Sequence, residues 1–316
     1  MRAVFLDLNS LDFGDLDLSP LKAVAAVEGH AKTSPEQVVA RLDGAAVAIV
    51  NKVVLTRDTL ARLPELRHIC IAATGTNNVD LAAATELGIS VSNCQGYGTA
   101  SVAQHVMGLM LALATRLVDY HAAIGRGEWQ RSDQFCLLNY PILELRGKTL
   151  GVIGYGELGR EVGRLAEAFG MQLVIAARPG TAPRNGRESL DRLLPHVDVL
   201  TLHCPLTAAT RNLIGAEQLA AMKPGALLVN AARGGIVDEF ALADALRSGH
   251  LGGAATDVLS VEPPREGNPL LDESLPNLIV TPHCAWGSRE ARQAIVAQLA
   301  ENITSFAQGR PCRVVG

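Results

Sequence analysis

Short apolar runs rich in β-branched residues alternate along the chain with longer Ala- and Leu-rich segments of helical period. This alternation is typical of parallel sheets whose faces are covered by helices, so it predicts an α/β protein. Four runs predict a first, smaller sheet: residues 2–7, 45–50, 67–73 and 89–93. Six more predict a second sheet: residues 149–153, 173–176, 197–203, 226–230, 253–257 and 278–281.

Two helical segments define the expected domain organisation. The segment TASVAQHVMGLMLALATRLVDYHAAI predicts one long helix, followed by a polar connecting arm around Trp129. This helix is more apolar than a surface helix should be, so we expect a homodimer that buries it. A last helix over residues 288–308 has an apolar stripe but no sheet of its own, so we expect it to return to the first domain. The predicted domains are therefore residues 1–98 with 284–316, and residues 99–283.

Composition and charge narrow the class of protein. With 316 residues and 48% hydrophobic content, the chain can form two cores and is not disordered. Its net charge of −4 gives no global reason to bind nucleic acid or an anionic membrane. The N-terminus lacks a signal-peptide pattern and the apolar runs are short or interrupted, so we expect a cytoplasmic protein.

The six cysteines contain no C-x-x-C pair and several lie in apolar runs, which predicts reduced thiols and no metal site. Cys284 is left open as either a reactive thiol or a small space-filling residue.

The stretch LGVIGYGELGREVGRLAEAFG places G-x-G-x-x-G between a predicted strand and a helix. Gly154 permits the tight turn, Gly156 lets the backbone approach a pyrophosphate, and Gly159 lets helix and strand pack closely. The pyrophosphate would lie on N–H groups at the helix N-terminus. Six strands are what a full dinucleotide-binding sheet requires, so we predict a cofactor site at this turn. It comprises Gly154, Tyr155, Gly156, Glu157, Leu158 and Gly159.

The next strand ends in Ala177-Arg178, where such units usually carry an Asp or Glu that binds the ribose 2′-hydroxyl of NAD. Ala177 can neither accept that hydrogen bond nor repel a 2′-phosphate. Arg178 offers a cation for the phosphate, and Arg184 and Arg187 follow in the same loop. We therefore expect NADP, with NAD as the alternative if these arginines are ordinary solvated charges.

Three polar stretches follow strands of the second sheet: NAARGGIVDE, GAATDVLSVEPP and VTPHCAWGSREAR. Ligands bind at the carboxyl edge of an open parallel sheet, so Arg233, Glu262 and His283 are expected to share one cleft. Each residue alone has a structural explanation, and only the combination favours a catalytic site.

Together these stretches resemble the D-isomer-specific 2-hydroxyacid dehydrogenases over essentially the whole chain. The resemblance also rests on HCPLTAATRNLIG and on MKPGALLVNAARGGIVDEFALADAL. AWGSREAR looks most like the glycerate dehydrogenase and hydroxypyruvate (glyoxylate) reductase branch. The resemblance implies a doubly wound parallel-sheet (Rossmann) cofactor domain inserted into a smaller flavodoxin-like α/β substrate domain. It also implies a small 2-oxo or 2-hydroxy acid as substrate.

The resemblance further implies residue roles. Arg233 would bind the substrate carboxylate and polarise the carbonyl, His283 would be the acid/base, and Glu262 would hold the imidazole. The backbone N–H groups of Thr74 and Gly75 would bind the carboxylate, and Asp257 would accept from the nicotinamide carboxamide. The remaining assignments are Trp286 to the substrate pocket and His203, Cys204, Pro205, Ala231 and Ala232 to the cofactor.

These roles agree with elementary chemistry. Hydride arriving at a 2-oxo acid leaves negative charge on the carbonyl oxygen, which a proton donor and a nearby cation stabilise. The planar guanidinium of Arg233 can bond both carboxylate oxygens, and an ionised Glu262 would favour protonated imidazole.

The same residues are compatible with other functions. Formate dehydrogenase shares the fold, but its site requires a Gln where this chain has Glu262. Many phosphoglycerate dehydrogenases carry an added C-terminal regulatory domain. The two domains expected here leave no room for it in 316 residues, which disfavours a phosphoglycerate specificity. A non-catalytic, nucleotide-sensing relative is disfavoured by the retained Arg, Glu and His. Another 2-hydroxyacid specificity is also open, because the pocket depends on the loop after Asn51-Lys52 and on Trp286.

Overall fold

The computed structural model describes all 316 residues and divides them into two compact units, Met1–Gly98 with Gly287–Gly316 and Thr99–Trp286. The second junction between the units therefore lies after Trp286. The predicted boundary, after residue 283, was three residues too early. The reason is local hydrogen bonding. The backbone N–H groups of Cys284 and Ala285 donate to Asp257, both at 2.9 Å, and the Trp286 indole N–H donates to the His283 carbonyl at 3.0 Å.

The first unit contains a five-stranded parallel sheet in the order β2-β1-β3-β4-β5. Its strands are β1 (Arg2–Phe5), β2 (Ala26–Gly29), β3 (Val47–Val50), β4 (His68–Ile71) and β5 (Ser90–Ser92). The sequence predicted four of them and missed β2. This edge strand, AVEG, is mostly exposed and carries no apolar run, so pairing with β1 rather than burial defines it.

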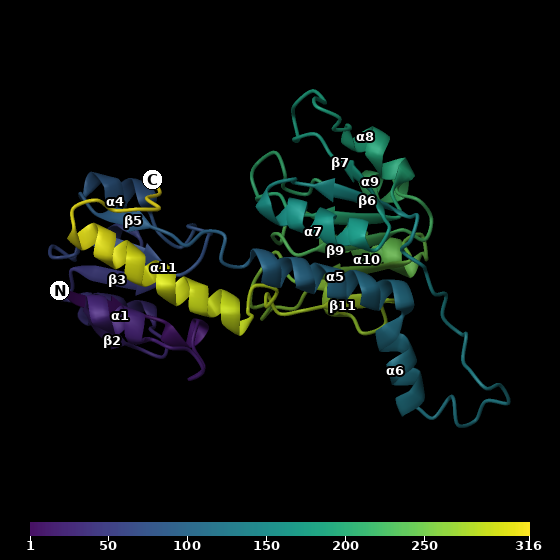
Figure 1. Ribbon diagram of the computed structural model, residues 1–316, viewed down its shortest axis with the longest axis horizontal. Helices are drawn as coiled ribbons and strands as arrows, with labels where there is room; N and C mark the ends of the chain where they lie inside the picture. The colour runs from purple at the N-terminus through teal and green to yellow at the C-terminus, as the bar shows by residue number, and fades with distance from the viewer. The chain divides into compact units, whose positions relative to one another are not determined.

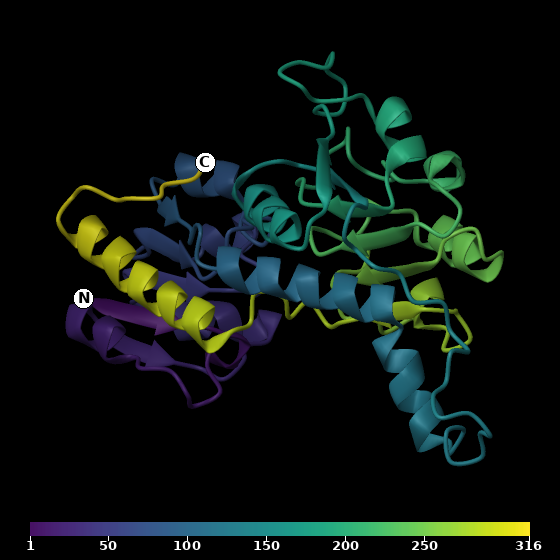
Figure 2. The ribbon, with the colours of Figure 1, turned by 45° about the vertical axis from the view of Figure 1, so that its right-hand side comes forward.

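The helices of this unit are α1 (Ser19–Val24), α2 (Val38–Leu42), α3 (Arg57–Leu60), α4 (Leu81–Glu86) and α11 (Arg289–Ala307). The C-terminal helix α11 lies along the sheet of the first unit in Figures 1 and 2. It buries Ile295, Leu299 and Ile303, so the first unit supplies the sheet that its apolar stripe covers. At its end Phe306 stacks on His68 with ring centroids 4.5 Å apart, and burial lowers the pKa of His68 to about 4.

The second unit contains a six-stranded parallel sheet in the order β11-β10-β9-β8-β6-β7. Its strands are β6 (Thr149–Ile153), β7 (Gln172–Ile175), β8 (Val199–Leu202), β9 (Leu227–Asn230), β10 (Gly253–Thr256) and β11 (Leu278–Val280). All six predicted strands are present. The chain runs outward from β6 to β7 and then returns to β8 on the other side, which makes the sheet doubly wound.

Helices cover both faces of this sheet: α5 (Thr99–Thr115), α7 (Glu157–Ala168), α8 (Leu190–Leu193), α9 (Ala216–Ala221) and α10 (Glu239–Arg247). Successive strand residues enter different cores. Leu228 packs with the α9 and α10 side, and Val229 packs with the α5 and α7 side. Burial on both faces explains why these strands are continuous apolar runs in the sequence.

The apolar segment after residue 98 is two helices, α5 and α6 (Leu117–Gly125), bent by 60°. The break lies at Arg116, which has a left-handed φ of 55° and bonds Asp119 through its Nε at 2.6 Å. The prediction of one continuous helix was therefore wrong. No single helix is long and apolar enough to cross a membrane, and α5 and α6 pass that test only as a bent pair.

The apolar composition of α5 does not indicate a dimer interface, contrary to the expectation from the sequence. The apolar side chains of α5, including Val106, Met110 and Leu113, pack inside their own unit, in the core shared with α7 and the sheet. The composition of α5 is thus explained within one chain.

Candidate active site

The glycine-rich turn joins β6 to α7 as the sequence predicts. Gly154 has a φ of 92°, and a Cβ there would lie 2.5 Å from backbone atoms of His203 and Cys204. A Cβ on Gly159 would lie 2.3 Å from the carbonyl oxygen of Gly154, so helix and turn pack without room for a side chain. A Cβ on Gly156 would meet no protein atom within 4 Å. Packing inside the chain therefore does not require glycine at 156, whereas close approach of a pyrophosphate would.

The residues after β7 lie where an adenine ribose would bind in such a sheet. The Ala177 N–H donates to the Glu188 carbonyl at 2.6 Å, which ties the strand end to the following loop. Arg178 is exposed, and its side chain forms no ion pair within the chain. The loop thus presents a guanidinium that is not neutralised by a carboxylate.

The segment after β8 carries the other predicted adenosine contacts. Burial lowers the pKa of His203 to about 4, so this imidazole is neutral at pH 7 and supplies no charge to a phosphate. Its Nε2 lies 3.0 Å from the Thr201 hydroxyl. Cys204 is buried, and Pro205 is exposed at the sheet edge.

His283 and Glu262 form the central pair of the site. The imidazole Nδ1 lies 2.6 Å from Glu262 Oε2, and Oε1 of the same carboxylate accepts the Leu259 N–H at 2.9 Å. Glu262 therefore fixes the ring through Nδ1, which leaves Nε2 for the acid/base role predicted from the sequence. The His283 side chain is 28% exposed, which permits access to a substrate.

The backbone of His283 is strained. Its φ of 52° lies in the left-handed region, which non-glycine residues rarely adopt. Two hydrogen bonds hold it there, from its N–H to the carbonyls of Asp257 at 2.8 Å and Thr281 at 3.0 Å. Strain maintained by the surroundings is common at functional positions.

Arg233 follows β9 in a loop that contacts the Glu262 loop. Asn230 holds this loop with its side chain, donating to the Arg233 carbonyl at 3.1 Å and accepting from the Ala232 N–H at 3.1 Å. A Cβ on Gly234 would lie 1.8 Å from the Leu259 carbonyl oxygen. The loops that carry Arg233 and Glu262 therefore touch at Gly234, which explains the glycine after the arginine.

Asp257, at the end of β10, organises the loop around His283. Its carboxylate is buried to 2% exposure and accepts from the Thr281 hydroxyl at 2.6 Å and from the N–H groups of Cys284 and Ala285. Oδ2 accepts only one of these bonds and keeps a lone pair for the carboxamide assigned to it. The role toward the carboxamide stays a prediction.

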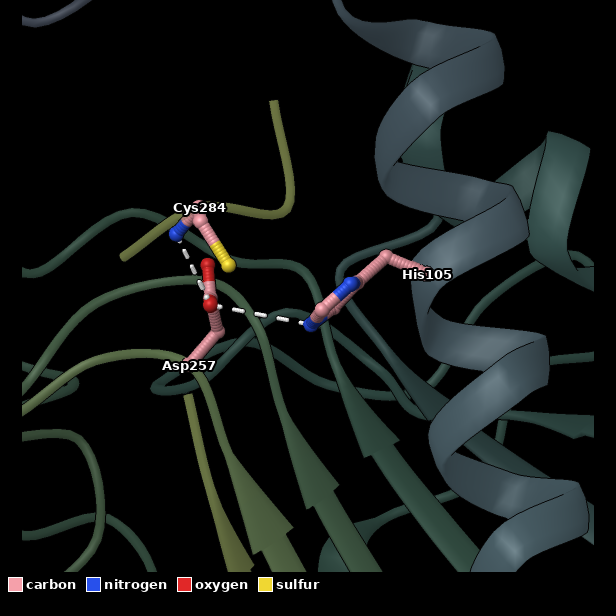
Figure 3. Close-up of side chains that lie close together, drawn as sticks. All are labelled: His105, Asp257 and Cys284. Carbon is pink, nitrogen blue, oxygen red and sulfur yellow. Dashed lines mark hydrogen bonds and ion pairs between the residues drawn. The ribbon is translucent and has the colours of Figure 1, made fainter. Parts of the chain in front are cut away.

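His105 is a residue of this site that no sequence motif indicates. This residue projects from α5 toward Asp257 (Figure 3), with Nε2 3.0 Å from the Thr281 hydroxyl and 3.6 Å from Asp257 Oδ1. The available signal was weak: His105 is the one ionisable residue in an otherwise uncharged helix.

Cys284 is an exposed residue, but partial burial of its thiol and the neighbouring Asp257 raise the pKa of the thiol. The thiolate is the nucleophilic form, so these surroundings disfavour a spontaneously reactive cysteine.

Thr74 and Gly75 belong to the first unit, in the loop after β4. The Thr74 hydroxyl donates to the Cys94 carbonyl at 2.9 Å, and the Thr74 carbonyl accepts from the Asn93 side chain at 2.9 Å. These bonds fix the loop backbone, as a site that uses backbone N–H groups requires. The second unit contains the predicted catalytic residues and the predicted pocket residue Trp286. The catalytic residues are Arg233, Glu262 and His283.

Asp7 is a second buried polar residue that no sequence motif indicates. It is 6% exposed, and its carboxylate accepts the N–H groups of Asn51, Lys52 and Val53 at 2.9, 2.6 and 3.2 Å. It thereby shapes the loop after β3, which borders a cavity of about 920 Å³ at the carboxyl edge of the first sheet.

Asp7→Asn is expected to loosen this loop. An amide can direct only one oxygen at the three donors, and its NH₂ group would face N–H groups. Leaving buried donors unpaired costs ~1–3 kcal/mol each, so the free energy of unfolding should fall and KM for the substrate should rise. Denaturant unfolding and steady-state kinetics test this, with the exposed Asp58→Asn as control. An unchanged KM would show that the loop does not shape the substrate pocket.

Comparison with known proteins assigns the chain to a family. The sequence profile described as "D-isomer specific 2-hydroxyacid dehydrogenase, NAD binding domain" matches residues 107–285, more than half of the chain. The chain belongs to this family. It is therefore a hydride-transfer oxidoreductase of the 2-hydroxyacid dehydrogenase type, as the sequence predicts.

Individual relatives agree over the full length. A glycerate dehydrogenase of Methylorubrum extorquens is 47% identical over 314 residues, 99% of this chain and 98% of the relative. A hydroxypyruvate reductase of Blautia hydrogenotrophica is 36% identical over 322 residues, 100% of this chain and 99% of the relative. A solved acyclic imino acid reductase in complex with NADPH and D-Arg is 26% identical, with a TM-score of 0.86 and full coverage of both chains.

Proposed function

We propose that this dehydrogenase reduces hydroxypyruvate and glyoxylate to D-glycerate and glycolate, prefers NADPH, and catalyses the reverse oxidations. The observation that carries the reaction class is the 2.6 Å contact between His283 Nδ1 and Glu262, in a loop touching the loop of Arg233. The names of the glycerate dehydrogenase and hydroxypyruvate reductase relatives support this substrate class.

The nicotinamide cofactor supplies the hydride that reaches the keto carbon. The residues of this chain do the rest. Arg233 binds the substrate carboxylate with two parallel N–H donors and thereby fixes which carbonyl face is presented. His283 donates the proton from Nε2 to the carbonyl oxygen as negative charge develops there. In the oxidation of D-glycerate the same nitrogen takes the proton back.

Glu262 argues against the formate dehydrogenase alternative. That reaction involves no proton transfer by the imidazole, and an amide suffices as its partner. A carboxylate bonded to Nδ1 at 2.6 Å instead orients the ring so that Nε2 is left for the proton transfer that keto-acid reduction needs.

Initial rates with a panel of 2-oxo acids and both reduced cofactors test the proposal. We expect the highest kcat/KM with hydroxypyruvate and NADPH, followed by glyoxylate, with pyruvate and phosphohydroxypyruvate far lower. A higher value for any other keto acid would reassign the substrate, and no turnover of any keto acid would reject the reaction.

Glu262→Gln gives a pH-dependent prediction. Gln keeps the shape and can still accept from the imidazole Nδ1–H, but it carries no charge to stabilise imidazolium. The high-pH loss of reductive activity should therefore move to lower pH, and the oxidation of D-glycerate should extend its activity to lower pH. Rate profiles in both directions check this, and profiles that coincide with the parent's would make Glu262 a structural residue only.

We also propose a homodimer in the cytoplasm. Helix α6 and the segment after it project from the sheet of the second unit in Figures 1 and 2. Large apolar side chains are exposed there: Leu117, Ile124, Trp129, Phe135, Leu138 and Ile142, with Phe135 at 89%. An exposed apolar surface of this kind favours association with a second copy. Light scattering tests the dimer.

The cysteines support the cytoplasmic location. All six are free thiols, which fits a reducing compartment, and cell fractionation tests the location.

A further inference from the structure

Three metal-ligating side chains from distant parts of the chain meet beside the His283 loop. His105 comes from α5, Asp257 from the end of β10 and Cys284 from the loop after β11 (Figure 3). Their candidate ligand atoms, one from each residue, all lie within 4.8 Å of one another, and His105 Nε2 is 3.6 Å from Asp257 Oδ1. Ligands of a tetrahedral zinc ion lie ~3.3–3.8 Å apart, so small side-chain rotations suffice to close the set.

We propose that His105, Asp257 and Cys284 form a binding site for a soft divalent cation such as Zn²⁺, and that a bound ion inhibits the enzyme. An imidazole, a carboxylate and a thiolate are ligands that zinc prefers, and two anionic ligands balance the charge of the ion. On binding, the thiol proton leaves to solvent and a sulfur–metal bond forms, with no change of oxidation state. Water completes the fourth position.

The present hydrogen bonds show what the ion would replace. The Thr281 hydroxyl lies 2.6 Å from Asp257 Oδ1 and 3.0 Å from His105 Nε2, so it links the carboxylate to the imidazole. The cation takes over this linking role, and a rotation of the threonine side chain frees both ligands. Cys284 is an exposed residue, which provides an entry path from solvent.

Inhibition follows from the position of the site. Asp257 holds the backbone of Cys284 and Ala285 and, through its own carbonyl, the strained backbone of His283. An ion bound at Asp257 Oδ1 would also draw electron density from this carboxylate and so weaken the hydrogen bond assigned to Oδ2 and the nicotinamide carboxamide. This effect on the cofactor rests on the proposed function, whereas binding of the ion does not.

The binding test uses Co²⁺ as a spectroscopic probe on the full-length protein, with a non-chelating phosphine reductant. We expect one Co²⁺ per chain with thiolate-to-metal charge-transfer absorption and the visible bands of a tetrahedral ion. Cys284→Ser should abolish the charge-transfer band. His105→Gln should weaken binding about tenfold or more, while Cys136→Ser should retain the parent spectrum and affinity. Loss of the band in Cys136→Ser, or its persistence in Cys284→Ser, would overturn the site.

The inhibition test titrates Zn²⁺ against NADPH-dependent reduction. Cys284→Ser should retain parent activity and need at least about tenfold more Zn²⁺ for half-inhibition, with Cys136→Ser unchanged. Inhibition should raise the KM for NADPH. Equal sensitivity of the parent and Cys284→Ser would overturn the inhibitory role. If no keto acid is reduced, the proposed function fails while the Co²⁺ spectrum still decides the site.

Discussion

Replacing His283 with Asn or Ala is expected to lower kcat for hydroxypyruvate reduction by roughly 10²-fold or more, the usual scale for a general acid or base. Both variants remove the imidazole that we propose as the proton donor, whose Nδ1 lies 2.6 Å from Glu262. The Asn variant is expected to disturb folding less than the Ala variant, because Asn tolerates the left-handed φ of 52° found at this position. Steady-state kinetics and NADPH binding followed by fluorescence measure the effect.

The loss should fall on kcat while the dissociation constant of NADPH changes little, since the proposed role of the imidazole is toward the substrate oxygen and not toward the cofactor. His196→Ala serves as the control, because His196 is exposed in the same unit and lies outside the site. A His283 variant that turns over hydroxypyruvate at nearly the parent rate would remove this residue from the chemistry. A matched drop in NADPH affinity would instead indicate a disturbed loop.

The second large effect concerns the 2′-phosphate of NADPH. Arg178→Ala should weaken NADPH binding by roughly 1.5–3 kcal/mol, or about 10- to 150-fold, and leave NADH unaffected. The exposed Arg178 side chain has no carboxylate partner in the chain, so its charge is available to a phosphate. Ala177→Asp should shift the preference toward NADH, because a carboxylate there accepts from a 2′-hydroxyl and repels a phosphate.

Values of kcat/KM with both cofactors measure this preference, and Arg192→Ala provides a matched control. Arg192 is an exposed arginine of α8, beyond the loop that follows β7. Equal or better efficiency with NADH in the parent protein would contradict the proposed NADP preference. A similar loss for Arg178→Ala and Arg192→Ala would show a general effect of positive charge rather than recognition of the phosphate.

The sequence by itself determined the strands of the second sheet and the turn at Gly154. Those strands are buried on both faces, so nearly every residue in them is apolar, and each strand is recognisable as a continuous apolar run. Contacts with nearby backbone leave no room for a side chain at Gly154 and Gly159. The G-x-G-x-x-G spacing is therefore sufficient to predict this turn. Residue types and their place after strands also sufficed to nominate Arg233, Glu262 and His283.

Only the tertiary structure decided the features that depend on contacts between distant segments. β2 exists because it pairs with β1, and its exposed residues leave no pattern in the sequence. The apolar character of α5 reflects packing on its own sheet, which composition alone does not distinguish from a dimer interface. The proposed cation site also depends on such contacts, because α5 lies beside the carboxyl ends of β10 and β11. It brings together His105, Asp257 and Cys284, which are too far apart in the sequence to form a recognisable motif.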